Sequence, residues 1–285
     1  MSAIQTNPRV DDRNWSKLSA GEQIRMLELE GYLVVPHLLT PEQIKDLKAQ
    51  TATLQTTAAD YSESQRFAHN FHRLGGALAD LPGNPKTIDF LRRLFGDEII
   101  IMSCIYVISK PGHPGVSLHT DGQPYGHEIF GYEESCPVLI RVLYYLDDLT
   151  SEVSPFRVVP RSHLSLHQDG NPYSRYERHP EEVMVTAQAG DAVFLNHKCF
   201  HGNFPNTGDR AREMLAIEYR PAWAGPVPIK PVAPWEDADL VNLPEHVKLL
   251  FGDRNLRRGN FAGGHKPAGM RSEAPGIDPS RWDRH

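Results

Sequence analysis

The chain has 285 residues, of which 40% are hydrophobic and 23% are charged, which supports a sizeable core and argues against global disorder. Its net charge of −6 argues against nucleic acid or an anionic membrane as the main partner, and no apolar run reaches the roughly 20 residues that cross a bilayer. Three widely spaced cysteines, and an N-terminus without the pattern of a secretory signal, predict a reduced, cytoplasmic protein.

The first third of the chain is predicted to be helical. Residues 19–31 have isoleucine, methionine and leucine at helical spacing, and Gly31 is the expected stop. A second helix is expected after Thr40, because this N-cap residue is followed by proline and then by the glutamine of a capping box. A third helix is expected over residues 84–96.

The rest of the chain is rich in β-branched residues separated by turn signals, which predicts strands. We expect these strands at residues 97–109, 116–120, 138–146, 156–160, 182–187, 191–196 and 213–219. Helices followed by strands at hairpin spacing predict a mainly β fold with flanking helices, a double-stranded β-helix or cupin-like jelly roll.

The sequence favours a single domain over residues 1–285. It would consist of a helical N-terminal part at about 1–97, a β-barrel core at about 98–223 and an irregular C-terminal tail at about 224–285. Nothing in the sequence determines the oligomeric state.

The most informative short motif is "HTD" at residues 119–121. In an extended strand His119 and Asp121 point to the same side and can converge on one point. Two histidines and one carboxylate on one face of a ferrous ion leave open positions for substrates and O2. The missing histidine is expected after the strand at 191–196, where His197 and His201 are both candidates. They are four residues apart, so strand parity does not choose between them.

Three segments together resemble the iron- and 2-oxoglutarate-dependent phytanoyl-CoA dioxygenase-like enzymes, in order and spacing, over roughly residues 25–223. They are "HTD" at 119–121, "LDDLTSEVSPFRVVPRSH" at 146–163 and "GDAVFLNHKCFHGNFPNTGDRAR" at 190–212. In such enzymes the distal metal ligand is the histidine of an H-G-x-x-x-N segment, here His201 with Asn206. An arginine about eleven residues later pairs with the far carboxylate of 2-oxoglutarate, which implies Arg212, with Arg210 as the nearby alternative.

The resemblance implies an Fe(II)/2-oxoglutarate-dependent dioxygenase with His119, Asp121 and His201 as metal ligands and no further catalytic residue. The cosubstrates would be 2-oxoglutarate and O2, and a C–H bond of a small-molecule metabolite would be hydroxylated or otherwise oxidised, with release of succinate and CO2. Halogenating relatives have a small residue in place of the carboxylate, so Asp121 favours hydroxylation, desaturation or rearrangement. No basic cluster for the phosphates of a CoA thioester flanks the motifs.

Further cosubstrate contacts follow from strand faces. Arg212 opens a strand and shares a polar face with Ala216 and Glu218, and its planar fork suits a carboxylate. Ser117 shares the face of His119 and is a candidate to touch the cosubstrate. Tyr144 is either a contact of the distal carboxylate or a core tyrosine. The loop at 122–135 is either a lid over the site or a solvated loop.

The sequence departs from the family pattern at two places, and it also leaves two alternative functions open. The chain has Val-Ser-Pro at 153–155 where relatives often carry Asn-Gly-Pro, and "PRSH" at 160–163 where they carry Pro-Gly-Ser-His. One alternative function is a zinc or manganese hydrolase or isomerase of the same fold, which would not need Arg212. The other is a binding module that has lost catalysis, although no ligand is missing.

Overall fold

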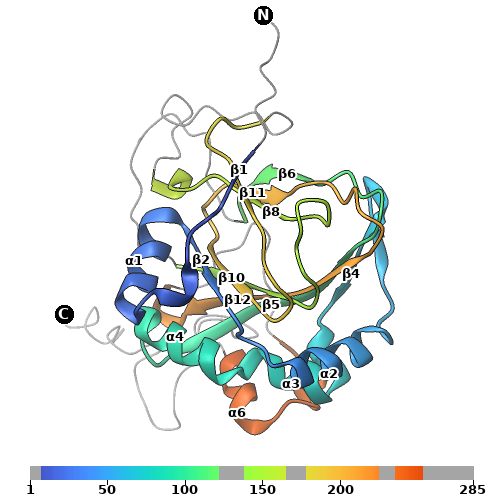
Figure 1. The fold of residues 1–285 in the computed structure, drawn as a ribbon. Helices are drawn as coiled ribbons and strands as arrows, with labels where there is room; N and C mark the ends of the chain where they lie inside the picture. The colour runs from blue at the N-terminus through green and yellow to red at the C-terminus, as the bar shows by residue number, and fades with distance from the viewer. Residues whose placement is uncertain (1–7, 122–137, 165–177, 225–234, 253–285) are drawn as a thin grey trace, which may run out of the picture.

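Two β-sheets face each other in this protein, and most of the helices lie against the outer side of the larger sheet (Figure 1). The computed structural model describes residues 8–121, 138–164, 178–224 and 235–252. The smaller sheet contains, in spatial order, β1 (Arg9–Val10), β9 (Val183–Val185), β8 (Phe156–Val158), β11 (His201–Asn203) and β6 (Val116–His119). The larger sheet contains β2 (Tyr32–Val35), β10 (Ala192–Asn196), β7 (Ile140–Tyr145), β12 (Arg212–Pro221), β5 (Ile99–Ser109), β4 (Ser62–His69) and β3 (Thr57–Ala59).

Strand pairing is antiparallel throughout the described residues, except that the short β1 runs parallel to β9. The α-helices are α1 (Ala20–Glu30), α2 (Pro41–Thr51), α3 (Gly76–Asp80), α4 (Pro85–Phe95), α5 (Asp237–Leu240) and α6 (Glu245–Lys248). Single 3-10 turns lie at Trp15–Lys17, Phe71–Leu74, Leu81–Gly83, Ser162–Leu164, Ala222–Ala224 and Leu249–Phe251. The predicted mainly β fold with flanking helices is confirmed.

The three predicted helices form where their capping signals lie. Ser19 and Thr40 each complete a capping box before α1 and α2. Helix α1 ends at Gly31, which has a φ of 83° in the left-handed region that favours glycine. A Cβ at Gly31 would also lie 2.6 Å from Nδ1 of His163 and 2.8 Å from Sγ of Cys199, so no larger residue fits there.

The prediction that the first third is helical is wrong in part, because β1 to β4 lie in it. The run "YLVV" of β2 is too short to show a period, and β4, "SESQRFAH", is mostly polar. Both form strands because they pair with longer ones, β2 with β10 and β4 with β5. Within the predicted irregular tail, residues 235–252 contain α5 and α6, while residues 225–234 and 253–285 lie outside the described residues.

The outer face of the larger sheet is apolar and is covered by α4. Phe194 of β10 packs against Phe90 of α4 with ring centroids 5.0 Å apart. Tyr144 of β7 faces the same side, and its hydroxyl lies 2.9 Å from Oγ1 of Thr87 on α4. Full burial of side chains of this size contributes roughly 1.5–3 kcal/mol each, which holds the helix layer on the sheet.

The inner face of the same sheet carries charged residues. Glu218 of β12 lies directly opposite Arg141 of β7 in the register. Arg212 begins β12 and is fully buried, on the same side of the strand as Glu218. Since alternate strand residues point to opposite sides, the sheet presents hydrophobic groups to the helices and charge to the space between the sheets.

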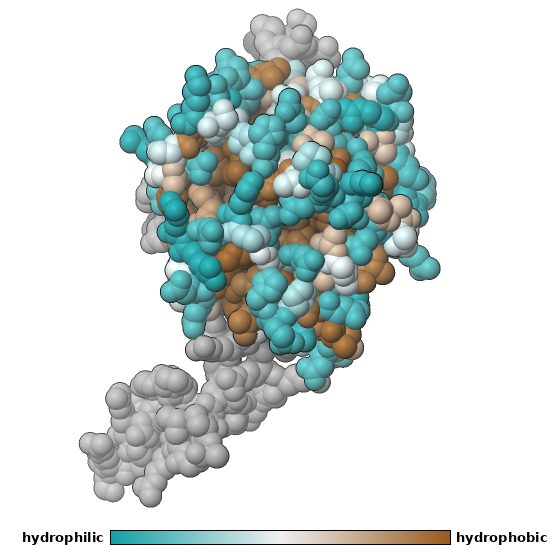
Figure 2. Space-filling model, turned by 60° about the horizontal axis from the view of Figure 1, so that its bottom comes forward, coloured by the Kyte–Doolittle hydropathy of each residue, from teal (hydrophilic) through white to brown (hydrophobic). Residues whose placement is uncertain are grey.

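The side of the molecule that carries the helices is shown in Figure 2. Hydrophilic side chains cover much of this face, with groups of hydrophobic ones between them. None of the described helices combines the length and the apolar character needed to cross a lipid bilayer.

Candidate metal centre

His119 and His201 lie directly opposite each other on the neighbouring strands β6 and β11. Their ring centroids are 4.4 Å apart, with 44° between the ring planes. Asp121 follows β6, and its backbone N–H donates to the carbonyl of His197, which turns the chain so that the carboxylate reaches the two imidazoles. The result is one carboxylate beside two histidines.

The potential ligand atoms of His119, Asp121 and His201 all lie within 4.8 Å of one another. Nε2 of His119 is 3.7 Å from Oδ1 of Asp121, and Nε2 of His201 is 3.5 Å from Oδ2. Among the described residues, Oδ2 has no hydrogen-bond partner although it is buried. A buried carboxylate oxygen with no donor is suited to bind a metal ion, because its burial is costly without a partner.

The tautomers of both histidines suit a metal. Nδ1 of His119 is 2.9 Å from the carbonyl of Ser117, and Nδ1 of His201 is 3.0 Å from the carbonyl of Cys199. A carbonyl only accepts, so Nδ1 carries the proton and the lone pair of Nε2 faces the carboxylate. Burial lowers the pKa of His201 to about 3, which keeps this imidazole neutral at pH 7.

Asp121 is ionised despite its burial. Burial by itself would raise the pKa of Asp121, but the Arg141 guanidinium and the nearby histidines outweigh it and hold the pKa below its usual range. Two imidazoles and one carboxylate form the donor set that non-haem Fe(II) sites use, so these residues fit iron.

The two histidines between which strand parity could not choose, His197 and His201, lie in different surroundings. The chain leaves β10 at Asn196, turns, and enters β11 at His201, so His197 and His201 do not share one straight strand. Nδ1 of His197 is 3.1 Å from the carbonyl of Leu139, and its Nε2 has no partner within the described part of the chain. The imidazole grouped with His119 and Asp121 is that of His201.

Arg212 is a fully buried guanidinium that pairs with no carboxylate among the described residues. Its Nη2 donates to Oγ of Ser109 at 2.8 Å and to Oγ of Ser154 at 3.3 Å, while its Nε has no partner there. Burial lowers the pKa of Arg212 below its ordinary value. Its Nη1 donates to Sδ of Met214 at 3.5 Å, so all the hydrogen-bond partners of this buried cation in the described residues are neutral, which fits the carboxylate of a bound ligand. Arg210, by contrast, donates to the backbone carbonyl of Asp148.

The glycine and the asparagine of the H-G-x-x-x-N segment, Gly202 and Asn206, each have a structural role. A Cβ at Gly202 would lie 2.3 Å from the carbonyl oxygen of Val116, so only glycine lets β11 approach β6 this closely. The side-chain amide of Asn206 donates to the carbonyls of Ser109 and Arg210, both at 2.9 Å. Asn206 therefore ties the turn before β12 to the end of β5, next to Arg212.

The prediction that Tyr144 reaches the distal carboxylate is wrong. Tyr144 lies opposite Leu215, on the helix side of the sheet, and bonds to Thr87. The neighbouring Tyr145 is on the side of Arg212, with the guanidinium carbon 5.9 Å from the ring centroid. Its buried hydroxyl has no partner among the described residues. The signal was available in the sequence, because Tyr145 has the strand parity of the charged Arg141.

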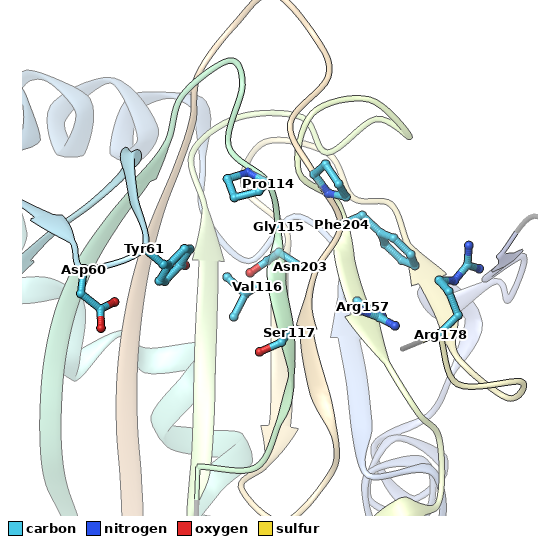
Figure 3. A pocket seen from close by; sticks show the side chains of 11 residues that line it. Asp60, Tyr61, Pro114, Gly115, Val116, Ser117, Arg157, Arg178, Asn203 and Phe204 are labelled. Atoms are coloured by element: carbon cyan, nitrogen blue, oxygen red, sulfur yellow. The ribbon is translucent and has the colours of Figure 1, made fainter. Parts of the chain in front are cut away.

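Ser117 lines a cavity of about 730 Å³ beside β6, shown in Figure 3. Arg157, Arg178 and Phe204 border one side of this cavity, and Tyr61 borders the other. His119, Asp121, His201 and Arg212 do not line this cavity. The cavity therefore gives no evidence that Ser117 contacts a cosubstrate bound at the metal. The loop at 122–135, the possible lid, lies outside the described residues.

The two departures from the family pattern both fall on left-handed backbone. Ser154 has a φ of 48° and Arg161 a φ of 66°, which cost a non-glycine residue about 1–2 kcal/mol. These are the positions at which the relatives carry glycine. The Ser154 hydroxyl donates to the carbonyl of Phe204 at 3.1 Å and accepts from Arg212. The departure thus adds a hydrogen-bond partner for the buried arginine.

Comparisons with known proteins agree with this geometry. The family model for phytanoyl-CoA dioxygenase (PhyH) matches residues 27–214. The chain is 24% identical over 237 residues to an L-proline trans-4-hydroxylase of Streptomyces griseoviridis, covering 71% of this chain and 87% of that enzyme.

Solved structures show the same fold. HygX from Streptomyces hygroscopicus with nickel, 2-oxoglutarate and hygromycin B bound has a TM-score of 0.57 and 17% identity, over 70% of this chain and 86% of that one. The epimerase SnoN in complex with Fe3+, alpha ketoglutarate and nogalamycin RO has a TM-score of 0.59 and 16% identity, over 76% of this chain and 93% of that one. The predicted double-stranded β-helix is thereby confirmed.

We expect His201→Ala to abolish binding of one divalent ion per chain, whereas His197→Ala keeps it. The reason is that only the His201 imidazole lies with His119 and Asp121. Titration of the metal-free protein with Co²⁺, followed by visible absorption, measures both. Loss of the ion in His197→Ala and its retention in His201→Ala would exchange the two assignments.

Proposed function

The chain belongs to the phytanoyl-CoA dioxygenase family, and on that premise we propose that it hydroxylates or otherwise oxidises a C–H bond of a small-molecule metabolite, releasing succinate and CO2. Membership in this family makes it an Fe(II)/2-oxoglutarate-dependent oxygenase. The observation that carries the proposal is the convergence of three ligand atoms within 4.8 Å in the same barrel as a buried arginine that pairs with no carboxylate in the described part of the chain.

In this proposal His119, Asp121 and His201 hold the iron through Nε2, Oδ2 and Nε2. Bound Fe(II) and 2-oxoglutarate supply the activation of O2 and the oxidation of the C–H bond. Arg212 would bind the far carboxylate of 2-oxoglutarate, while Ser109 and Ser154 accept hydrogen bonds from its Nη2 and orient the guanidinium. We include Tyr145 in place of Tyr144 as a donor to that carboxylate, and we keep Ser117 as a candidate contact.

A small free metabolite or a natural-product intermediate is the proposed substrate class. Two relatives support it by what their names state, an L-proline hydroxylase and a structure with hygromycin B bound. The carboxylate of Asp121 fills the position that halogenating relatives leave open, which favours hydroxylation, desaturation or rearrangement. The inactive-module alternative is less suited, because no member of the ligand set is missing.

We also propose that the chain acts as a single domain in the cytoplasm. One hydrophobic cluster contains residues of both sheets and of the helices, from Trp15 to Phe251. The two cysteines in the described residues, Cys104 and Cys199, are free and buried, in keeping with a reducing compartment.

The direct test of the function compares iron-loaded with zinc-loaded protein. We expect succinate formation from 2-oxoglutarate with the iron-loaded form only, and stimulation by the correct small molecule in a screen of candidate substrates. Zinc has no redox chemistry, so it occupies the ligands without supporting the reaction. Turnover of a substrate by the zinc-loaded form without 2-oxoglutarate would instead support a hydrolase or isomerase.

Arg212→Ala tests the cosubstrate assignment. Removing one partner of a buried, hydrogen-bonded charge pair costs about 2–5 kcal/mol. The apparent constant for 2-oxoglutarate should therefore rise roughly thirty-fold or more, measured from the dependence of succinate formation on its concentration. Arg210→Ala is the matched control, because it removes the same charge two residues away. A larger effect in the control would transfer the role to Arg210, and no effect in either would reject the assignment.

Ser154→Gly tests the hydroxyl next to Arg212. A hydrogen bond to a charged group contributes about 1.5 kcal/mol or more, so we expect the 2-oxoglutarate constant to rise about ten-fold. Arg161→Gly is the control, because it also places glycine at a left-handed position but away from Arg212. It should leave the 2-oxoglutarate constant unchanged. Equal constants in both variants would show that Ser154 has no part in cosubstrate binding.

A further inference from the structure

The Asp121 carboxylate meets a different partner at each of its two oxygens. Oδ1 lies 3.1 Å from Nη1 of Arg141, whereas Oδ2 lies toward His201 and has no hydrogen-bond partner among the described residues. The side chain of Asp121 is only 7% exposed, so solvent does not compete for either oxygen. Oδ1, which also lies 3.7 Å from Nε2 of His119, is therefore paired with a guanidinium, whereas Oδ2 faces His201 and has no hydrogen-bond partner among the described residues.

Arg141 is itself held in place. Its Nε donates to Oε1 of Glu218 at 3.1 Å, its Nη2 donates to the same oxygen, and Oε2 of Glu218 accepts from Oγ of Ser103 at 2.6 Å. Arg141, Glu218 and Ser103 lie directly opposite one another on β7, β12 and β5. Cross-strand neighbours in the middle of a sheet have little freedom to move, so the guanidinium is presented to Asp121 at a set position.

We propose that Arg141 is a positioning residue that keeps Asp121 a one-oxygen ligand of the metal. A carboxylate that used both oxygens would take a fourth position on the ion and leave fewer for the cosubstrate and O2. By holding Oδ1 in a buried ion pair, Arg141 leaves Oδ2 for the metal. This inference rests on the metal site of the proposed function and adds residues outside the family motifs.

Charge balance supports the same role. Asp121 and Glu218 together carry two negative charges, and Arg141 neutralises one of them. Among these three side chains one negative charge is left in a buried setting, which is unfavourable until a cation binds beside it. A divalent ion at Oδ2 supplies that cation, so the trio is suited to hold a metal and not only to join two strands.

The test uses Co²⁺ titration of the metal-free, full-length protein in three variants. Residues that orient a metal ligand typically change metal affinity 10–100-fold when replaced, and we expect Arg141→Gln to weaken Co²⁺ binding by about that factor. Glu218→Gln should weaken it less, since the arginine remains but is held less firmly. Arg141→Lys should rescue it in part, because a single ammonium cannot hold both carboxylates.

A second measurement separates positioning from a loss of affinity alone. At saturating Co²⁺, Arg141→Gln should also bind 2-oxoglutarate more weakly, because the freed Oδ1 competes for a coordination position. Arg157→Gln is the matched control, since Arg157 forms a buried pair with Glu182 in the smaller sheet and does not bond to Asp121. It should leave both affinities near those of the wild type.

Wild-type affinities for Co²⁺ and 2-oxoglutarate in Arg141→Gln would overturn the inference. So would an equal loss in Arg157→Gln, because that would trace the effect to a loosened fold. If the wild type binds Co²⁺ with the predicted variant pattern but makes no succinate, the proposed function fails and the role of Arg141 stands. A wild type that binds no Co²⁺ would reject both.

Discussion

The pairing of β6 with β11 is the contact on which the site depends. It sets His119 directly opposite His201, two residues that are far apart in the sequence. The close approach of the strands requires Gly202, since any side chain there would collide with the backbone of β6. Because the two histidines are cross-strand neighbours, their Nε2 atoms converge without help from flexible loops, and Asp121 needs only to follow β6 to join them.

The larger sheet provides the rest of the site through the alternation of its strands. Its helix side buries aromatic rings such as Phe194 and Tyr144, which contribute the apolar burial that stabilises the fold. Its inner side carries Arg141, Glu218 and Arg212, whose burial is costly unless each finds a partner. Arg141 pairs with both Glu218 and Asp121, whereas Arg212 has no carboxylate partner among the described residues. The sheet thus presents a buried guanidinium, that of Arg212, to which a bound ligand can supply the carboxylate partner.

Local backbone strain occurs beside the same arginine. Ser154 has left-handed backbone that glycine would adopt at lower cost, yet its hydroxyl joins the carbonyl of Phe204 to the guanidinium of Arg212. Asn206 organises the turn on the other side by bonding to the carbonyl of Ser109. Strained or fully bonded loop residues of this kind are found where a structure must hold a functional group in one orientation.

The sequence by itself determined the elements whose signals are local. The capping box at Thr40 and the stop at Gly31 predicted helix ends correctly, because these signals act within one turn of helix. Strands rich in β-branched residues were also recognised, and the same-side geometry of His119 and Asp121 followed from strand parity alone.

Only the tertiary structure decided what depends on long-range pairing. Strand β2 is four residues long, and β11 only three, so neither shows a period, and each exists because a neighbouring strand satisfies its backbone. A turn between β10 and β11 places His197 and His201 in different surroundings. Strand parity could not distinguish them, because it assumes that both lie in one straight strand. The link from Arg141 to Asp121 likewise required the tertiary structure, because Arg141 lies on a strand of the larger sheet and Asp121 follows a strand of the smaller one.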